Sequence, residues 1–172
     1  MRFALLAGLA LIGACKPPPS DAGLSREVPE AEPTFASAPL PSPDSEGAVW
    51  ARSQAREGRI VYGVPGEAAL LALECLGGTE AAAVQMTRIA VADEGAGALL
   101  AMVGNGHIGR LPVDARAAGD ANIWQGEAAA SDSLWEPLRG PRALTVTVPG
   151  AGMVRVNGSE LPGDLIAQCR ED

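Results

Sequence analysis

The sequence predicts a mostly β fold of the α+β class, a small antiparallel sheet or barrel with a short internal helix and a C-terminal helix. Two observations support this prediction. From Ala48 onward, short runs rich in Val, Ile, Leu and Ala alternate with turn signals built from Gly, Pro and Asn. The final stretch, PGDLIAQCRED, instead places Leu165, Ile166 and Cys169 at helical spacing. A barrel and a curved sheet covered by the terminal helix both fit this order.

The first part of this region is expected to form strands at residues 58–64, 68–75, 83–91, 98–103, 107–112 and 122–127. The run at 68–75 (AALLALEC) is apolar enough for a buried strand or a short helix. Pro65–Gly66 before it and Gly77–Gly78 after it favour the strand. Asn105–Gly106 predicts a hairpin turn, because both residues tolerate a positive φ.

The later part is expected to begin with a short helix capped by Ser131, with Leu134, Trp135 and Leu138 on its apolar face. A β-branched strand, ALTVTV, follows at 143–148. A second hairpin is expected from strands at 152–156 and 159–161 around Asn157–Gly158. The C-terminal helix should then start at Pro162 or Gly163.

The first fifteen residues, MRFALLAGLALIGAC, have the organisation of a secretory signal. Arg2 gives a positive start, residues 3–12 are apolar, and two small residues precede Cys15. The apolar run is too short for a membrane span, which needs about 20 residues. The ending LIGAC resembles the lipobox of bacterial lipoproteins. That resemblance implies removal of residues 1–14 and attachment of a diacylglycerol to the Cys15 thiol, with an ordinary secretory signal as the alternative.

A lipid on Cys15 would make the membrane a partner of this chain and place it in the bacterial cell envelope, with the domain in the periplasm or at the cell surface. Several acyl chains hold a protein firmly, because each buried methylene contributes about 0.8 kcal/mol. Lys16 rather than an aspartate follows the cysteine, which slightly favours the outer membrane over the inner membrane.

Residues 15–47 are expected to be the lipidated cysteine followed by a disordered tether. Residues 16–47 hold eight of the fourteen prolines and six acids, with Lys16 and Arg26 as the only cations. Such a segment has little to bury, so ordering it would not repay the entropy. Packing back onto the domain is the alternative. A single β-rich globular domain is expected over residues 48–172, a usual domain size.

The charge of the chain argues against one class of partner. The formal net charge is −8, and residues 48–172 hold fifteen acids against ten arginines. The chain has no basic patch with interleaved aromatics, so nucleic acid is not an expected partner. An envelope protein remains a candidate partner, since an acidic surface weakly favours a basic one.

Cys75 and Cys169 remain once Cys15 is assigned to lipid. An exported domain meets an oxidising compartment, where an even pair of cysteines most often forms a disulfide. The bridge would join the strand at 68–75 to the C-terminal helix. A metal site and a reactive thiol are the alternatives, disfavoured because the chain has a single histidine and no CxxC spacing.

The sequence shows no catalytic, cofactor-binding or metal-binding constellation. His107 stands beside the Asn105–Gly106 turn, and the adjacent acids Asp93 and Glu94 lie in a glycine-rich loop. Catalysis would require a neighbouring nucleophile or burial to tune such groups. Trp124 and Trp135 could line a ligand cleft, although in a domain so poor in aromatics they are better explained as core residues.

A resemblance covers roughly residues 70–170. Arg110, Leu111 and Pro112 close a strand–turn–strand unit, SDSLWEPLRGPRALTVTVPG follows, and LPGDLIAQCR ends the region. In these features the region resembles a group of uncharacterised exported bacterial proteins that end in a Cys-Arg helix. The resemblance implies a shared fold and the same cysteine pair, and no activity.

These observations favour a membrane-anchored envelope lipoprotein of unknown molecular activity, a non-enzymatic binding or accessory module without a cofactor. One alternative is a periplasmic hydrolase or small-ligand enzyme whose site is assembled from dispersed residues, with His107 in a deep pocket. Another is an inhibitor of a basic wall-degrading enzyme, which the negative net charge of the chain weakly favours.

Overall fold

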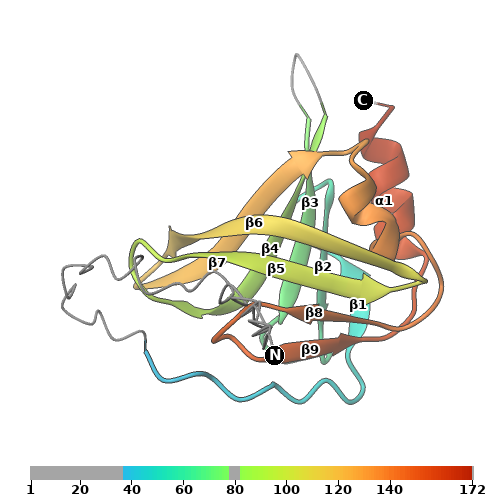
Figure 1. Ribbon diagram of the computed structural model, residues 1–172. Helices are drawn as coiled ribbons and strands as arrows, with labels where there is room; N and C mark the ends of the chain where they lie inside the picture. Colours follow the sequence, from blue (N-terminus) through green and yellow to red (C-terminus); the bar gives the residue numbers. More distant parts are fainter. Residues whose placement is uncertain (1–36, 78–81, 172) are drawn as a thin grey trace, which may run out of the picture. The chain divides into compact units, whose positions relative to one another are not determined.

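The computed structural model describes residues 37–77 and 82–171 and confirms the predicted mostly β fold (Figure 1). Residues 1–36, including the predicted signal and Cys15, lie outside the described part, as do residues 78–81 and 172. The strands are β1 Val49–Arg52, β2 Arg59–Gly63, β3 Leu71–Leu76, β4 Ala83–Ala92, β5 Gly97–Gly104, β6 His107–Ala118, β7 Ala121–Ala129, β8 Leu144–Thr147 and β9 Met153–Val156. The helices are the 3-10 helix η2 Ser133–Leu138 and the α-helix α1 Leu161–Cys169.

All nine strands belong to one antiparallel sheet in the order β1-β2-β3-β4-β7-β6-β5-β8-β9. Successive side chains of a strand point to opposite faces, so one register row shares one face. Ile60, Leu73 and Met86 form such a row across β2, β3 and β4, and each is at most 1% exposed. This face is the core, and the opposite face of these strands is polar.

The sheet turns a corner between β7 and β6. These strands pair only over residues 114–118 and 121–125, so the rest of each strand diverges from the other. Gly126 continues the core-facing row opposite Met86. A Cβ on Gly126 would lie 2.1 Å from the Pro112 carbonyl oxygen, which shows how closely the two strands approach. Glycine at this position therefore permits the corner.

The curved sheet nearly closes on itself, so the architecture is a curved sheet that approaches, but does not complete, the closed barrel. The Tyr62 hydroxyl on β2 donates to the Arg155 carbonyl on β9 (3.0 Å) and accepts from the Asn157 amide (3.0 Å). The Asn157 side chain donates to the Ala48 carbonyl beside β1 at 2.7 Å. The two edge strands are thus bridged by side chains, although no ladder joins them.

Both expected helices are present. The N-cap of η2 is Asp132, whose carboxylate accepts from the Leu134 amide at 2.8 Å, so the expectation of Ser131 is wrong by one residue. Trp135 is fully buried, as expected of a core residue. Helix α1 buries Leu165, Ile166 and Cys169, the face predicted from their spacing.

The second predicted hairpin is wrong. Strand β9 pairs with β8 instead, through a turn that contains Gly150 and Gly152 with φ of +81° and +69°. Residues 159–161 are not a strand. The Asn157 amide donates to the Tyr62 hydroxyl, and its side chain donates to the Ala48 carbonyl. A Cβ on Gly158 would lie 1.8 Å from the Pro141 carbonyl oxygen. These tertiary contacts fix a conformation that the Asn-Gly pair alone does not reveal.

One strand was missed, and several boundaries differ from the prediction, most of all the end of β6. Strand β1 was not predicted, because its four residues are exposed except for Trp50 and give no alternating pattern. Strand β6 continues beyond Pro112 to Ala118, because its end pairs with β7.

Residues 37–47, which we call the strap, run along the domain (Figure 1, blue to cyan). Its Ser37 amide donates to the Asp93 carboxylate at 2.9 Å, and the Leu40 amide donates to the Gly150 carbonyl at 2.8 Å. Ser42 accepts from the Met153 amide at 3.0 Å. The compact unit therefore includes residues that the sequence placed in the tether, before the expected boundary at 48.

Candidate functional site

A cavity of about 670 Å³ opens at the end of the sheet where α1 packs. One wall is the connection from β1 to β2, residues 52–59. The others are the end of β3 with Cys75 and Gly77, and the face of α1 that carries Leu165, Gln168 and Cys169. Its size is within the usual range of small-molecule sites, about 300–1,000 Å³.

The β1–β2 connection is held against β3 by backbone hydrogen bonds. The Cys75 amide donates to the Gly58 carbonyl at 2.9 Å, and the Ser53 amide donates to the Arg59 carbonyl at 2.9 Å. Gly58 has a φ of +68°, a conformation that glycine adopts without strain. The wall of the cavity is therefore a defined turn that continues the β2–β3 ladder.

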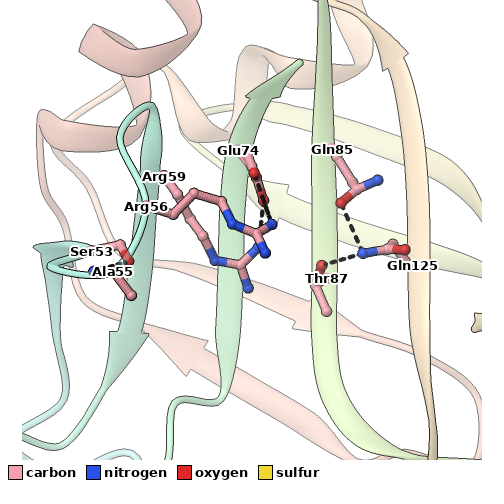
Figure 2. Close-up of polar contacts among 8 residues, drawn as sticks. All are labelled: Ser53, Ala55, Arg56, Arg59, Glu74, Gln85, Thr87 and Gln125. Atoms are coloured by element: carbon pink, nitrogen blue, oxygen red, sulfur yellow. Dashed lines mark hydrogen bonds and ion pairs between the residues drawn. The ribbon is translucent and has the colours of Figure 1, made fainter. Parts of the chain in front are cut away.

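An ion-pair cluster lies at this wall (Figure 2). Glu74 on β3 faces Arg59 on β2 in the sheet register, and Arg59 Nη1 is 2.6 Å from its carboxylate. Arg56 Nη1 lies 3.0 Å from both carboxylate oxygens of Glu74. The Glu74 side chain is 10% exposed whereas that of Arg56 is 62% exposed. Glu74 thus holds two arginines on the polar face of the sheet, opposite the face that carries Ile60, and the Arg56 side chain remains mostly exposed.

Arg52 adds a third cation to the lining, and no described carboxylate lies within ion-pair distance of it. The lining holds three arginines and one acid, Glu57, whereas Glu74, the partner of Arg56 and Arg59, lies outside it. The chain as a whole carries −8, so this cavity is a local cationic region on an acidic protein.

The floor of the cavity is apolar and covalently braced. Cys75 and Cys169 form the predicted disulfide, with an S–S distance of 1.98 Å and a Cα–Cα distance of 5.5 Å. The bridge joins β3 to α1 across a sequence separation of 94 residues. Leu165 and Ile60 are the other apolar residues of the lining, and both are almost fully buried. The lining thus combines arginines with buried apolar residues and the disulfide.

A second, shallower hollow of about 340 Å³ lies on the polar face of β4, β7 and β6. Here the Gln125 amide donates to Gln85 at 2.8 Å and to Thr87 at 3.2 Å (Figure 2). Gln85 pairs with Glu74 in the sheet register, so this polar face continues from the ion-pair cluster. Asp114, Arg116 and Glu127 also line this hollow, and Arg116 is paired with Asp114 at 3.3 Å, so its charged groups are net acidic.

A third hollow, of about 250 Å³, lies between the strap and Trp124. Trp124 is 7% exposed and belongs to the hydrophobic core, as the sequence indicated. Asp93 at this end accepts hydrogen bonds from Ser37, and these bonds, first from the hydroxyl and then from the amide, lower the pKa of the Asp93 carboxyl. These contacts explain Asp93 as an attachment point for the strap.

The residues singled out for chemistry are not brought together. His107 is exposed beside the β5–β6 turn, whereas Asp93 lies beyond the other end of β5. The eight residues of β5 separate them by roughly 25 Å at about 3.3 Å per residue. No cluster of three or more His, Cys, Asp or Glu side chains suited to a metal occurs within residues 37–77 and 82–171.

Sequence reasoning missed the arginine cavity, although a signal was present. Three arginines occur within RSQAREGR, residues 52–59, and a single acid interrupts the apolar run ALLALEC. A lone acid in a buried strand requires a cationic partner, because burying an unpaired charge is costly. That requirement points from Glu74 to the arginines of the neighbouring strand.

No protein-family model, curated protein or solved structure matched this chain when it was compared with them. In the part of the chain that the structure describes, no helix is both long enough and apolar enough to span a membrane.

Proposed function

We propose that this protein is a lipid-anchored lipoprotein of the bacterial envelope, attached through Cys15, and that its folded head is a non-enzymatic binding module. The binding site is the cavity between the β1–β2 connection, β3 and α1. The signal-like residues 1–14 and the LIGAC ending support the anchor. The cationic, disulfide-braced cavity supports the binding role.

The observation that carries the binding role is the cavity, which three arginines line at the end of the sheet far from the Ser37 contact of the strap. Strand β4 begins at Ala83, paired with Leu76 beside the cavity, and ends at Ala92 next to the strap contact Asp93. Its ten residues span roughly 30 Å at about 3.3 Å per residue. The cavity and the Ser37 end of the strap therefore lie at opposite ends of the domain.

The anchor is tested by the intact mass and the location of the protein in its native cells. We expect a chain that starts at Cys15, carries added acyl mass and sediments with membranes. A Cys15→Ala variant should lose the acyl mass and leave the membrane fraction. A native chain without acyl mass would overturn the anchor.

The binding role is tested by photo-crosslinking in intact cells. A photoreactive residue at Gln54, in the cavity wall, should capture a specific envelope component. The matched position is Asp120, which is exposed in the β6–β7 turn at the strap end. Equal products from both positions, or none from Gln54, would overturn the assignment of the cavity as the binding site.

A further inference from the structure

We propose that the exposed face of β6, β5, β8 and β9 is the contact between two copies of this chain, related by a two-fold axis. The apolar centre of this face supplies the contact area, and Arg110 of each copy pairs with Asp44 in the strap of the other. This inference goes beyond the proposed function, because it concerns a different surface from the cavity. It rests on the exposed apolar residues, on the charges at the two borders of the face and on the symmetry of a dimer.

The strand register places the side chains of this face in two rows across the four strands. The first row is Ile108, Val103, Thr145 and Arg155. The second row is Arg110, Ala101, Thr147 and Met153. On each strand the residue between the two rows is buried in the core, because successive side chains point to opposite faces. The two rows therefore belong to the outer face of the sheet.

The centre of this face exposes aliphatic side chains. Val103 is 46% exposed, Ile108 is 59% exposed, and Leu99, the next outward residue of β5 before Ala101, is 53% exposed. Leu99 pairs in the register with Pro112, which is also exposed. Contiguous exposed apolar side chains mark interaction surfaces. A second sheet packed on this face would remove them from water.

The strap forms the border of this face beside β9, and this border is net acidic. The strap is attached to the Met153 amide and again, beyond the end of β9, to the Asn157 side chain. The exposed acids Asp44 and Glu46 lie between these two attachments. Arg155 is the cation of β9 on this face, so the two acids leave one negative charge in excess at this border.

The opposite border, on β6, is cationic. Arg110 is exposed there, and no carboxylate of the described residues lies within ion-pair distance of it. Asp114, farther along the strand, is already paired with Arg116 at 3.3 Å. The face is thus positive at one border and negative at the other, which is a pattern that can pair with a copy of itself.

A two-fold axis parallel to the strands, in the plane between two stacked copies, brings these borders together. It places β6 of one copy over β9 and the strap of the other, and β5 over β8. A two-fold interface must be self-complementary, because both copies use the same patch. Arg110 then faces Asp44 of the other copy on both sides of the apolar centre. An anionic membrane would attract Arg110 but repel the strap acids, so a second copy fits both borders better.

The test measures the association of the full mature chain by sedimentation equilibrium, with Cys15→Ala so that neither lipid nor detergent adds mass. A face of four short strands is small, so we expect a weak dimer that forms as the concentration rises toward about 1 mM. A chain that is still a monomer at that concentration would overturn the proposal.

Two matched valine variants identify the face. Val103→Glu brings an acid from each copy into the apolar centre and should weaken association about tenfold, because like charges in an interface repel. Val91→Glu is the control, since Val91 is 65% exposed on β4, outside this face. Equal weakening by the two variants would overturn the assignment of the dimer contact to this face.

A charge exchange tests the contact between Arg110 and Asp44. Arg110→Asp and Asp44→Arg each create like charges at both borders and should weaken association severalfold. The double variant restores opposite charges and should recover most of the lost affinity, whereas losses that simply add would overturn this contact. If Asp44→Arg disturbs the strap, the comparison of Val103→Glu with Val91→Glu still decides the face.

Vesicles of phosphatidylglycerol probe the other occupant of such a face. We expect the dimeric chain to show no binding to them that depends on Val103. A chain that stays monomeric and binds these vesicles, with the binding lost in Val103→Glu, would assign the face to a membrane and overturn the dimer.

Discussion

Single side chains join separate segments through hydrogen bonds in the interior of this sheet, and Arg88 is the clearest case. Its side chain is buried on β4, where it donates to the backbone carbonyls of Leu70, Ile89 and Ala151 at 2.9–3.1 Å. Burial lowers the pKa of the Arg88 guanidinium. The carbonyls belong to separate segments, so this one cation ties the start of β3 and the β8–β9 turn to β4.

At the same scale, we predict that Gly126→Ala destabilises the fold. A Cβ there would lie 2.1 Å from the Pro112 carbonyl oxygen and 2.9 Å from a Val113 methyl carbon, and the backbone oxygen cannot move without opening the corner. Overpacking of this kind costs about 1–3 kcal/mol. The free energy of unfolding, measured with denaturant, checks the value.

Gly77→Ala is the matched control for that substitution. Nothing lies within 4 Å of the Cβ it would add, so its unfolding free energy should stay close to that of the parent chain. Equal effects of the two substitutions would contradict the corner as the cause.

The strap and α1 show how separate elements depend on a few contacts. The strap has few side chains to bury and is held through hydrogen bonds at Ser37, Leu40 and Ser42. Helix α1 buries one face and is joined to β3 by the disulfide. We make one prediction for each of these two attachments.

For the strap, we predict that the Ser37 contact is lost in acid. Only the ionised Asp93 carboxylate accepts both hydrogen bonds, which places its folded pKa below the ordinary value of 3.8. The contribution is therefore fully present above about pH 3.8 and is lost as the pH falls through the lower, folded pKa. The Ser37 amide proton shift, followed by NMR from about pH 6 to about pH 2, reports this loss. An Asp93→Asn chain with the same pH response would contradict the assignment.

For α1, we predict that replacing Cys75 and Cys169 together with alanine lowers the unfolding free energy by roughly 2–5 kcal/mol. The bridge restricts a loop with a sequence separation of 94 residues in the unfolded chain. Denaturant unfolding of the double variant measures the loss. Reduction of the parent chain should give a similar midpoint, and an unchanged midpoint in both would show that packing alone retains the helix.

At the largest scale, the described residues 37–77 and 82–171 contain one nine-stranded sheet, in which side chains join β2 and the residue before β1 to the end of β9. Tyr62, Asn157 and the Ala48 carbonyl make this bridge, and Arg88 closes the end near the strap. The corner at Gly126 bends the sheet enough for the edges to approach. The bridge gives partners to three backbone groups near the two edges of the sheet, the carbonyls of Ala48 and Arg155 and the amide of Asn157.

We predict that Tyr62→Phe weakens this closure without making a cavity, because the ring is kept. The change leaves the Arg155 carbonyl and the Asn157 amide without their partner, which costs about 1–3 kcal/mol. Hydrogen exchange of the Asn157 amide should accelerate more than that of the β3–β4 ladder. Uniform acceleration across the sheet would indicate a general loss of stability instead.

Local patterns by themselves determined the β class, most strands and the apolar face of α1, whereas the pairing of Cys75 with Cys169 was expected because two cysteines remain once Cys15 is assigned to lipid. Turn chemistry and side-chain periodicity act over a few residues, so a single sequence displays them directly. The same local logic failed at Asn157–Gly158, where an Asn-Gly pair serves closure rather than a hairpin turn.

Only the tertiary structure decided the near closure of the sheet, the attachment of the strap and the arginine cavity. Each depends on residues far apart in the chain, such as Tyr62 with Arg155 or Arg56 with Glu74. Contacts of this kind form when the sheet bends and α1 packs on its end. Short-range propensities do not encode that geometry. The sequence contains the arginines and the acid, and the fold pairs Arg56 and Arg59 with Glu74 and brings three arginines to one cavity.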